Sequence, residues 1–205
     1  AGHIYSGPIA GAAYASVRHL ANRIQRVVLL GPAHRVAFKG VAVPSVDAHA
    51  TPLGNIPVDW QSVAQALSLP QVHISDAVFE GEHSLEVHLP FLQRALGKFA
   101  LVPLLVGDAT PEGVEQILRK LWGGPETLIV ISTDLSHFHD YDTARKRDAN
   151  TTRAIETFNV EGLNSDLACG VRPLSGLLRA AQRLDLRPTT LDLRNSGDTA
   201  GDKNR

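Results

Sequence analysis

The sequence predicts an α/β fold with a mainly parallel sheet flanked by helices, because short apolar strands alternate with longer helical segments. Residues 26–30, 100–106 and 127–132 are continuously apolar or nearly so and rich in Val, Ile and Leu, which is typical of parallel strands covered on both faces. Residues 189–193 alternate in polarity and predict a fourth strand nearer an edge, and residues 41–44 a short extra strand. Strands that alternate with helices indicate one α/β domain.

Helical composition and N-terminal signals occur between these strands. Thr110 is a good N-cap before Pro111, and Pro57 and Pro173 suit a first helical turn. Pro90 falls inside an apolar helical pattern and is expected to kink it. The predicted helices are 8–22, 58–67, 84–96, 111–122, 142–158 and 173–184.

Charge and composition narrow the function classes. Twenty Lys and Arg against 21 Asp and Glu give a net charge of -1, so we expect neither nucleic acid nor a membrane surface as a partner. No apolar run approaches the ~20 residues that cross a bilayer, and one cysteine cannot form an internal disulfide. We therefore expect a cytoplasmic protein with a single domain over 1–205, lacking a short N-terminal segment and the last strand.

Polar residues follow two of the predicted strands. His34 comes after a Gly-Pro turn behind the first strand, and Asp134 and His137 come after the strand at 127–132. Ligands of open α/β sheets bind beyond the carboxyl ends of the strands, so these residues are predicted to meet at one edge. His34 fits a metal ligand or catalytic imidazole, or a loop histidine bonded to backbone. Asp134 and His137 fit a general acid/base pair, or an ordinary helix N-cap.

Two further groups contain chemistry-bearing residues. His83, Glu86 and His88 stand at i, i+3 and i+5, which does not place all three on one helical face. His83, with Glu86, is favoured as a residue that supports the ligands or contacts substrate, rather than as a ligand itself. Cys169 precedes a predicted helix, whose N-terminus favours a thiolate, and Arg172 is expected to act in the same direction. A small buried cysteine remains the alternative.

Several longer strings resemble the Memo family, whose prokaryotic members are called AmmeMemoRadiSam system protein B. They occur in family order over essentially the whole chain: AGHIYSGPIAGAAYA, LLGPAHRVAFKGVAVPSVDAHATPLG, EHSLEVHLPFLQ, VPLLVGD, ISTDLSHFHDYDTARKRD, CGVRPLSGLL and LRNSGDTAG. The resemblance implies a fold like that of the class III, LigB-type extradiol dioxygenases, which are non-haem iron enzymes.

The resemblance also implies roles for individual residues. The family's metal pocket has two His and one Cys, of which the second His matches His34 and the Cys matches Cys169. The pocket's S-[ST]-D-x-x-H string matches Asp134 and His137, and the His of its E-H-S motif matches His83. The first family His would stand immediately before Ala1, and His3 occupies the place of a family Tyr.

Two functions follow as expectations. In the first, a mononuclear metal ion, Fe(II) in preference to Cu or Zn, supports redox or dioxygenase-like chemistry on a small molecule or peptide. His34 and Cys169 hold the ion, and His137 is a general acid/base oriented by Asp134. His83 positions substrate or oxygen. In the second, the pocket is a non-catalytic binding module for a protein or peptide partner, with radical-SAM and AMMECR-type proteins as candidates.

Overall fold

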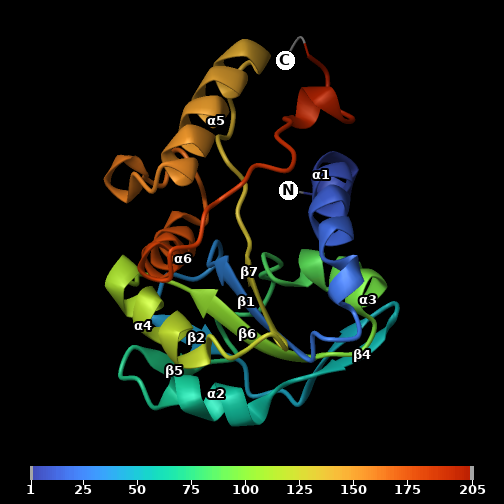
Figure 1. Ribbon diagram of the computed structural model, residues 1–205, viewed down its shortest axis with the longest axis vertical. Coiled ribbons are helices and arrows are strands. Elements are labelled where there is room, and N and C mark those ends of the chain that lie inside the picture. The colour runs from blue at the N-terminus through green and yellow to red at the C-terminus, as the bar shows by residue number, and fades with distance from the viewer. Residues whose placement is uncertain (1, 204–205) are drawn as a thin grey trace.

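The computed structural model describes residues 2–203, which form a central sheet with helices on both faces (Figure 1). These residues form the following helices and strands in chain order. They are α1 (His3–Ser16), β1 (Arg26–Pro32), β2 (Val41–Val43), β3 (Ala48–Thr51), β4 (Gly54–Pro57), α2 (Trp60–Leu67), β5 (Val72–Ile74), α3 (Leu89–Leu96), β6 (Ala100–Val106), α4 (Pro111–Leu121), β7 (Thr127–Ile131), α5 (Tyr141–Glu156) and α6 (Val171–Arg183). Short 3-10 turns lie at Arg18–Leu20, Glu86–His88, Val160–Gly162 and Ser196–Asp198.

The main sheet has the strand order β5-β2-β6-β1-β7. The central strand β1 is parallel to both neighbours, and its Leu30 lies beside Leu104 of β6 and Ile131 of β7. β2 is parallel to β5 and antiparallel to β6. The expected α/β fold with a mainly parallel sheet is therefore confirmed.

Both faces of the sheet are buried, as the apolar strands predict. On one face Val28 and Leu30 pack with α2 and α4, and on the other Val27 and Leu29 pack with α1 and α3. All four β1 side chains have no exposed surface, and burying each contributes about 1.5–3 kcal/mol. Because both faces are covered by helices, ligands have access to the sheet at its edges.

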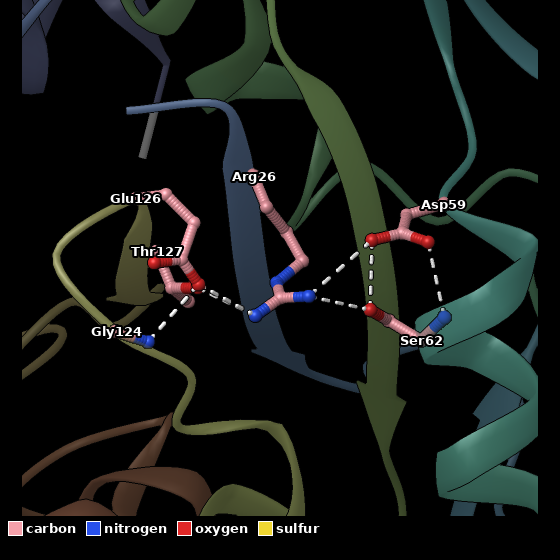
Figure 2. Close-up of polar contacts among 6 residues, drawn as sticks. All are labelled: Arg26, Asp59, Ser62, Gly124, Glu126 and Thr127. Carbon is pink, nitrogen blue, oxygen red and sulfur yellow. Dashed lines mark hydrogen bonds and ion pairs between the residues drawn. The ribbon is translucent and has the colours of Figure 1, made fainter. Parts of the chain in front are cut away.

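Arg26 ties three elements together at the amino end of β1 (Figure 2). Its guanidinium donates to Ser62 Oγ of α2 at 3.0 Å, and on the other side to Thr127 Oγ1 of β7 at 2.7 Å and to Glu126 Oε1 at 3.2 Å. Asp59, the N-cap of α2, lies 3.7 Å from the same guanidinium. The amino end of the sheet is thus held by the contacts of Arg26. The loops that follow β1 and β7 lie at the opposite, carboxyl end.

Several predicted boundaries differ from the structure. The predicted fourth strand at 189–193 is wrong, because these residues form no strand: their alternating pattern suits an edge strand, but no described strand offers them a ladder. The helix predicted from residue 84 begins at Leu89, so Pro90 lies in its first turn, where a missing N–H costs nothing, rather than at a kink. The helix α1 begins at His3, five residues before the predicted start.

Three short strands were not predicted. β3 and β4 form a hairpin in which Ala48 lies beside Pro57 and Thr51 beside Gly54, and β5 adds three residues to the edge of the main sheet. All three have only three or four residues and a mostly exposed or half-buried pattern, so their apolar signal is weak. The short strand predicted at 41–44 is present as β2.

The longest helix, α5, lies beyond the carboxyl end of β7 and apart from the sheet (Figure 1). It is mostly polar, as expected from its sequence. No helix within residues 2–203 has the length and apolar character needed to span a membrane.

Candidate metal centre

The loops that follow β1 and β7 emerge side by side at the carboxyl edge of the sheet. The two strands are parallel neighbours, and the ladder extends one step further through Ser132 N–H, which donates to Leu30 O at 2.7 Å. His34 follows β1 by two residues and Asp134 follows β7 by three. The strand register thus brings two segments that are 100 residues apart in sequence to one edge, as predicted.

Cys169 reaches the same edge from the start of α6. A Cβ on the following residue, Gly170, would stand 2.4 Å from Ser132 O and 2.7 Å from Thr133 Cβ, so only glycine allows this close approach. Hydrogen bonds hold the contact: Cys169 N–H donates to Asp134 O at 3.1 Å, and Asp134 N–H donates to Cys169 Sγ at 3.2 Å. Sγ therefore lies at the edge where the two loops meet, with a backbone N–H directed at it.

Asp134, His137 and Cys169 form the candidate centre. One ligand atom from each, a carboxylate oxygen, an imidazole nitrogen and Sγ, lies within 4.8 Å of the other two. Asp134 Oδ2 is 4.0 Å from His137 Nε2, and both side chains remain partly open to solvent. Within residues 2–203 this is the group in which at least three His, Cys, Asp or Glu side chains bring ligand atoms within 4.8 Å of one another.

Asp148 of α5 supports the loop that bears Asp134 and His137. It is buried and accepts a hydrogen bond from Ser136 N–H at 2.9 Å. A buried carboxylate on backbone N–H fixes the loop more firmly than a neutral acceptor would. The long helix α5 therefore has a direct structural link to the candidate centre.

His34 and His83 are both in contact with a buried carboxylate, Glu82. Glu82 Oε1 lies 3.2 Å from His34 Nδ1 and 3.6 Å from His83 Nδ1, and Oε2 accepts the backbone N–H of His34 at 2.5 Å. Burial by itself would raise the pKa of Glu82, but hydrogen bonds from the backbone N–H groups of His34 and Ser84 and from the His34 imidazole outweigh it and lower that pKa to about 2.

Glu82 is the buried carboxylate of this region that the sequence analysis missed. It stands next to His83, but no local spacing shows that a carboxylate will be buried. The available signal was that Glu82 immediately precedes His83 in the E-H-S string. His34 does not belong to the group of three within 4.8 Å, although it shares their edge of the sheet.

Two other expectations concern residues around the centre. Arg172 pairs with Asp108 at 2.8 Å, so its charge is already engaged by an acid. His3 contacts Val87 O through Nε2 at 2.9 Å and packs edge-on against Phe91. Neither residue belongs to the Asp134, His137 and Cys169 group.

His88 is held on the core side of this region. Its Nδ1 lies 2.8 Å from Tyr14 Oη; burial raises the pKa of Tyr14, so this phenol stays protonated and donates to the ring. Burial also lowers the pKa of His88 to about 4, against the opposing effect of the Asp134 charge. His88 is therefore a neutral structural histidine near neutral pH, whereas Glu86 is exposed.

Comparisons with known proteins identify the family. The family model described as "Memo: Memo-like protein" matches residues 1–205. Curated relatives named MEMO1 family protein include those of Sulfolobus acidocaldarius, 31% identical over 99% of this chain and 76% of the relative, and Aquifex aeolicus, 35% identical over 98% and 78%. A relative from Methanosarcina mazei is 32% identical over 99% and 79%.

A solved structure of an uncharacterised Escherichia coli K12 protein covers 82% of this chain and 81% of its own, at 15% identity and a TM-score of 0.48. At that level the likeness supports no argument about function. The family match over the full sequence and the relatives above 30% identity agree with each other. The chain belongs to the Memo family.

Proposed function

We propose that this protein binds one transition-metal ion at the carboxyl edge of its sheet and uses it in redox chemistry on a small molecule or peptide. The observation that supports this most directly is the grouping of a carboxylate, an imidazole and a thiol sulfur, from Asp134, His137 and Cys169, within 4.8 Å. Borderline and softer metals favour such a mixture of nitrogen, oxygen and sulfur donors, whereas Mg²⁺ and Ca²⁺ favour oxygen alone.

The donor set fits a metal ion for a second reason. Cys169 Sγ accepts the Asp134 N–H, and His34 has Nδ1 facing Glu82, which leaves Nε2 available. In this proposal Cys169, from the group of three, and His34, which lies outside that group, hold the ion; His34 is included because the family resemblance implies it. Fe(II) is the metal we favour for redox use; Zn and Cu are the competitors, because a thiolate ligand shifts preference toward them.

The remaining residues would act on the substrate. His137 takes or returns a proton at a substrate hydroxyl, and Asp134, with Oδ2 4.0 Å from His137 Nε2, orients that ring and stabilises its protonated form. His83, more exposed than His34, positions the substrate. When bound, the ion would supply the electron-transfer and Lewis-acid chemistry that these side chains lack. The resemblance to extradiol dioxygenases makes catechols the first substrates to test.

The experiment compares metal content and turnover in one set of variants. Protein purified without oxygen is loaded with Fe(II), and metal content and oxygen uptake with catechols are measured in wild type, Cys169→Ala, His34→Ala and His137→Gln. One ion per chain should be lost in the first two variants. His137→Gln should retain the ion and lose turnover; His19→Ala, an exposed histidine elsewhere, should match wild type.

Each outcome assigns a role. Loss of the ion in His137→Gln while His34→Ala retains it would make Asp134, His137 and Cys169 the ligand set. Stoichiometric metal in Cys169→Ala, or a wild type that takes up no metal, would refute the proposal. Metal binding without oxygen uptake on any catechol would remove ring cleavage and leave metal binding intact.

A second candidate function, a binding module, is favoured by Phe138. Its ring is fully exposed beside His137, and its backbone has φ 60, a left-handed conformation that bulky residues rarely adopt. An exposed aromatic ring beside the candidate centre suits contact with a partner. Radical-SAM and AMMECR-type proteins are the partners to test by co-purification. If Phe138→Ala abolishes capture and the double variant His34→Ala/Cys169→Ala does not, the surface binds the partner without the metal.

A further inference from the structure

Glu82 joins the loop after β1 to the turn before α3 at the carboxyl end of β1. We propose that Glu82 is the positioning residue of this site, whose carboxylate holds the imidazoles of His34 and His83 with Nδ1 facing it and so leaves both Nε2 atoms free for a metal ion or substrate. The use of those Nε2 atoms rests on the proposed function, whereas the orientation of the rings does not.

The contacts of Glu82 are unusually complete. Oε1 accepts the backbone N–H groups of His83 at 2.9 Å and Ser84 at 2.8 Å, and it also lies 3.2 Å from His34 Nδ1. Oε2 accepts the backbone N–H of His34. One carboxylate therefore fixes both the backbone and the ring of His34, a residue 48 positions away.

The chemistry of these contacts sets the imidazole tautomer. A carboxylate accepts hydrogen bonds and donates none, so the His34 nitrogen that bonds to it has to be protonated Nδ1. In a neutral imidazole the other nitrogen, Nε2, then keeps its lone pair. His83 Nδ1 lies 3.6 Å from Oε1, beyond hydrogen-bond distance, but it faces the same negative charge, which favours a proton on Nδ1 there as well.

Packing prevents the carboxylate from moving away. The Glu82 side chain is only 2% exposed, and the segment after it presses on the end of β1. A Cβ at Gly31 would stand 2.7 Å from Leu85 Cδ2 and 2.9 Å from Ser84 Oγ. The contact of Ser84 and Leu85 with Gly31 of β1 therefore fixes the position of Glu82 relative to His34.

The direct test reads the tautomers without any metal. Two-bond ¹⁵N–¹H correlation spectra of histidine-labelled, metal-free protein at about pH 8, above the usual imidazole pKa, distinguish protonated Nδ1 from protonated Nε2. We expect both His34 and His83 to be protonated at Nδ1 in wild type. In Glu82→Gln we expect protonated Nε2 to appear at His34. Protonated Nε2 in wild-type His34 or His83 would overturn the proposal, even if the variant did not fold.

The matched control is Glu115→Gln. Glu115 is equally buried, but its partners are Arg179 and Arg183 rather than histidines. It should leave both tautomers unchanged, so a general effect of losing a buried carboxylate would be visible. Glutamine keeps one oxygen that can accept from Nδ1, so the decisive variant is Glu82→Leu, which offers no acceptor. Unchanged tautomers in folded Glu82→Leu would show that the carboxylate does not set them and would also overturn the proposal.

A second measurement tests whether the positioning serves the centre. Titration with Co(II), followed by thiolate-to-cobalt charge-transfer absorption, should show about 10–100-fold weaker binding in Glu82→Gln than in Glu115→Gln, the usual effect of removing a carboxylate that orients a ligating imidazole. Equal affinities of the two variants for Co(II) would refute the idea that Glu82 positions the histidines for metal binding. If wild type binds no Co(II) while its tautomers are as expected, the proposed function fails and the orientation of the rings by Glu82 stands.

Discussion

Acid unfolding should reveal the anchoring carboxylate Glu82 as a stabilising charge that Glu82→Gln lacks. The pKa of Glu82 falls from 4.5 to about 2 in the folded protein because hydrogen bonds to the carboxylate outweigh its burial. A pKa that is lowered on folding gives stability that is fully present above the unfolded value and is lost as pH falls toward the folded value. The window for Glu82 therefore runs from about pH 5 down to about pH 2.

The size of the effect follows from the shift. A difference of 2.5 pKa units, at 1.36 kcal/mol each, is about 3 kcal/mol in total, of which about 2 kcal/mol is lost between pH 6 and pH 3. Wild type should lose this free energy of unfolding over that interval in addition to the losses from its other carboxylates. Glu82→Gln should be less stable at pH 7 and should lose about 2 kcal/mol less on acidification.

The assay is urea denaturation of metal-free protein, followed by circular dichroism at half-unit steps from pH 6 to pH 3. Glu80→Gln is the control: it removes the same charge two residues away from an exposed side chain and should run parallel to wild type. The comparison of slopes is independent of the stability that each variant has at neutral pH. If Glu82→Gln also runs parallel to wild type, the carboxylate is not held by the four donors and the reasoning about Glu82 fails.

Three other substitutions test the surrounding structure. Gly170→Ala should lower the free energy of unfolding by about 1–3 kcal/mol in urea denaturation, since its Cβ would stand 2.4 Å from Ser132 O. The control Gly11→Ala, whose Cβ would have nothing within 4 Å, should not lower it. Equal effects of the two substitutions would refute the close approach at Gly170. Phe138→Gly should raise the free energy of unfolding by about 1 kcal/mol through relief of its left-handed backbone, whereas a loss would mean that the exposed ring is a stabilising contact. Arg26→Met should cost about 2 kcal/mol by leaving the acids of Figure 2 without their cation, and a neutral result in the same assay would show that this network does not stabilise the sheet.

The sequence predicts the long elements well because their signals are local. The strands β1, β6 and β7 are continuous apolar runs, and Thr110 caps α4 through its side chain as expected. The short strand β5 and the hairpin of β3 and β4 depend on partners distant in the chain rather than on their own composition. The failed strand at 189–193 shows the same limit from the other side, since alternation creates a strand only where a partner ladder exists.

For the candidate centre, local signals locate the residues but not their contacts. The rule that ligands bind beyond the carboxyl ends of strands places His34 and Asp134 at one edge, and the parallel pairing of β1 with β7 makes the loops that bear them neighbours. That rule predicts neither the contact of Glu82 with His34 nor the contact of Cys169 with Asp134. Both depend on glycines, Gly31 and Gly170, where the absence of a side chain lets a second segment come within 3 Å.

Close approach at these glycines also explains why the centre has the shape it has. At Gly170 the start of α6 meets the end of β7, so Cys169 and Asp134 bond to each other through backbone and sulfur. At Gly31 the turn before α3 meets the end of β1, so a buried acid comes within reach of His34. A larger residue at either position would separate two groups that the proposed chemistry needs together, and it would do so without touching any ligand atom. The site is therefore set as much by what these two positions lack as by the histidines, the cysteine and the acids around them.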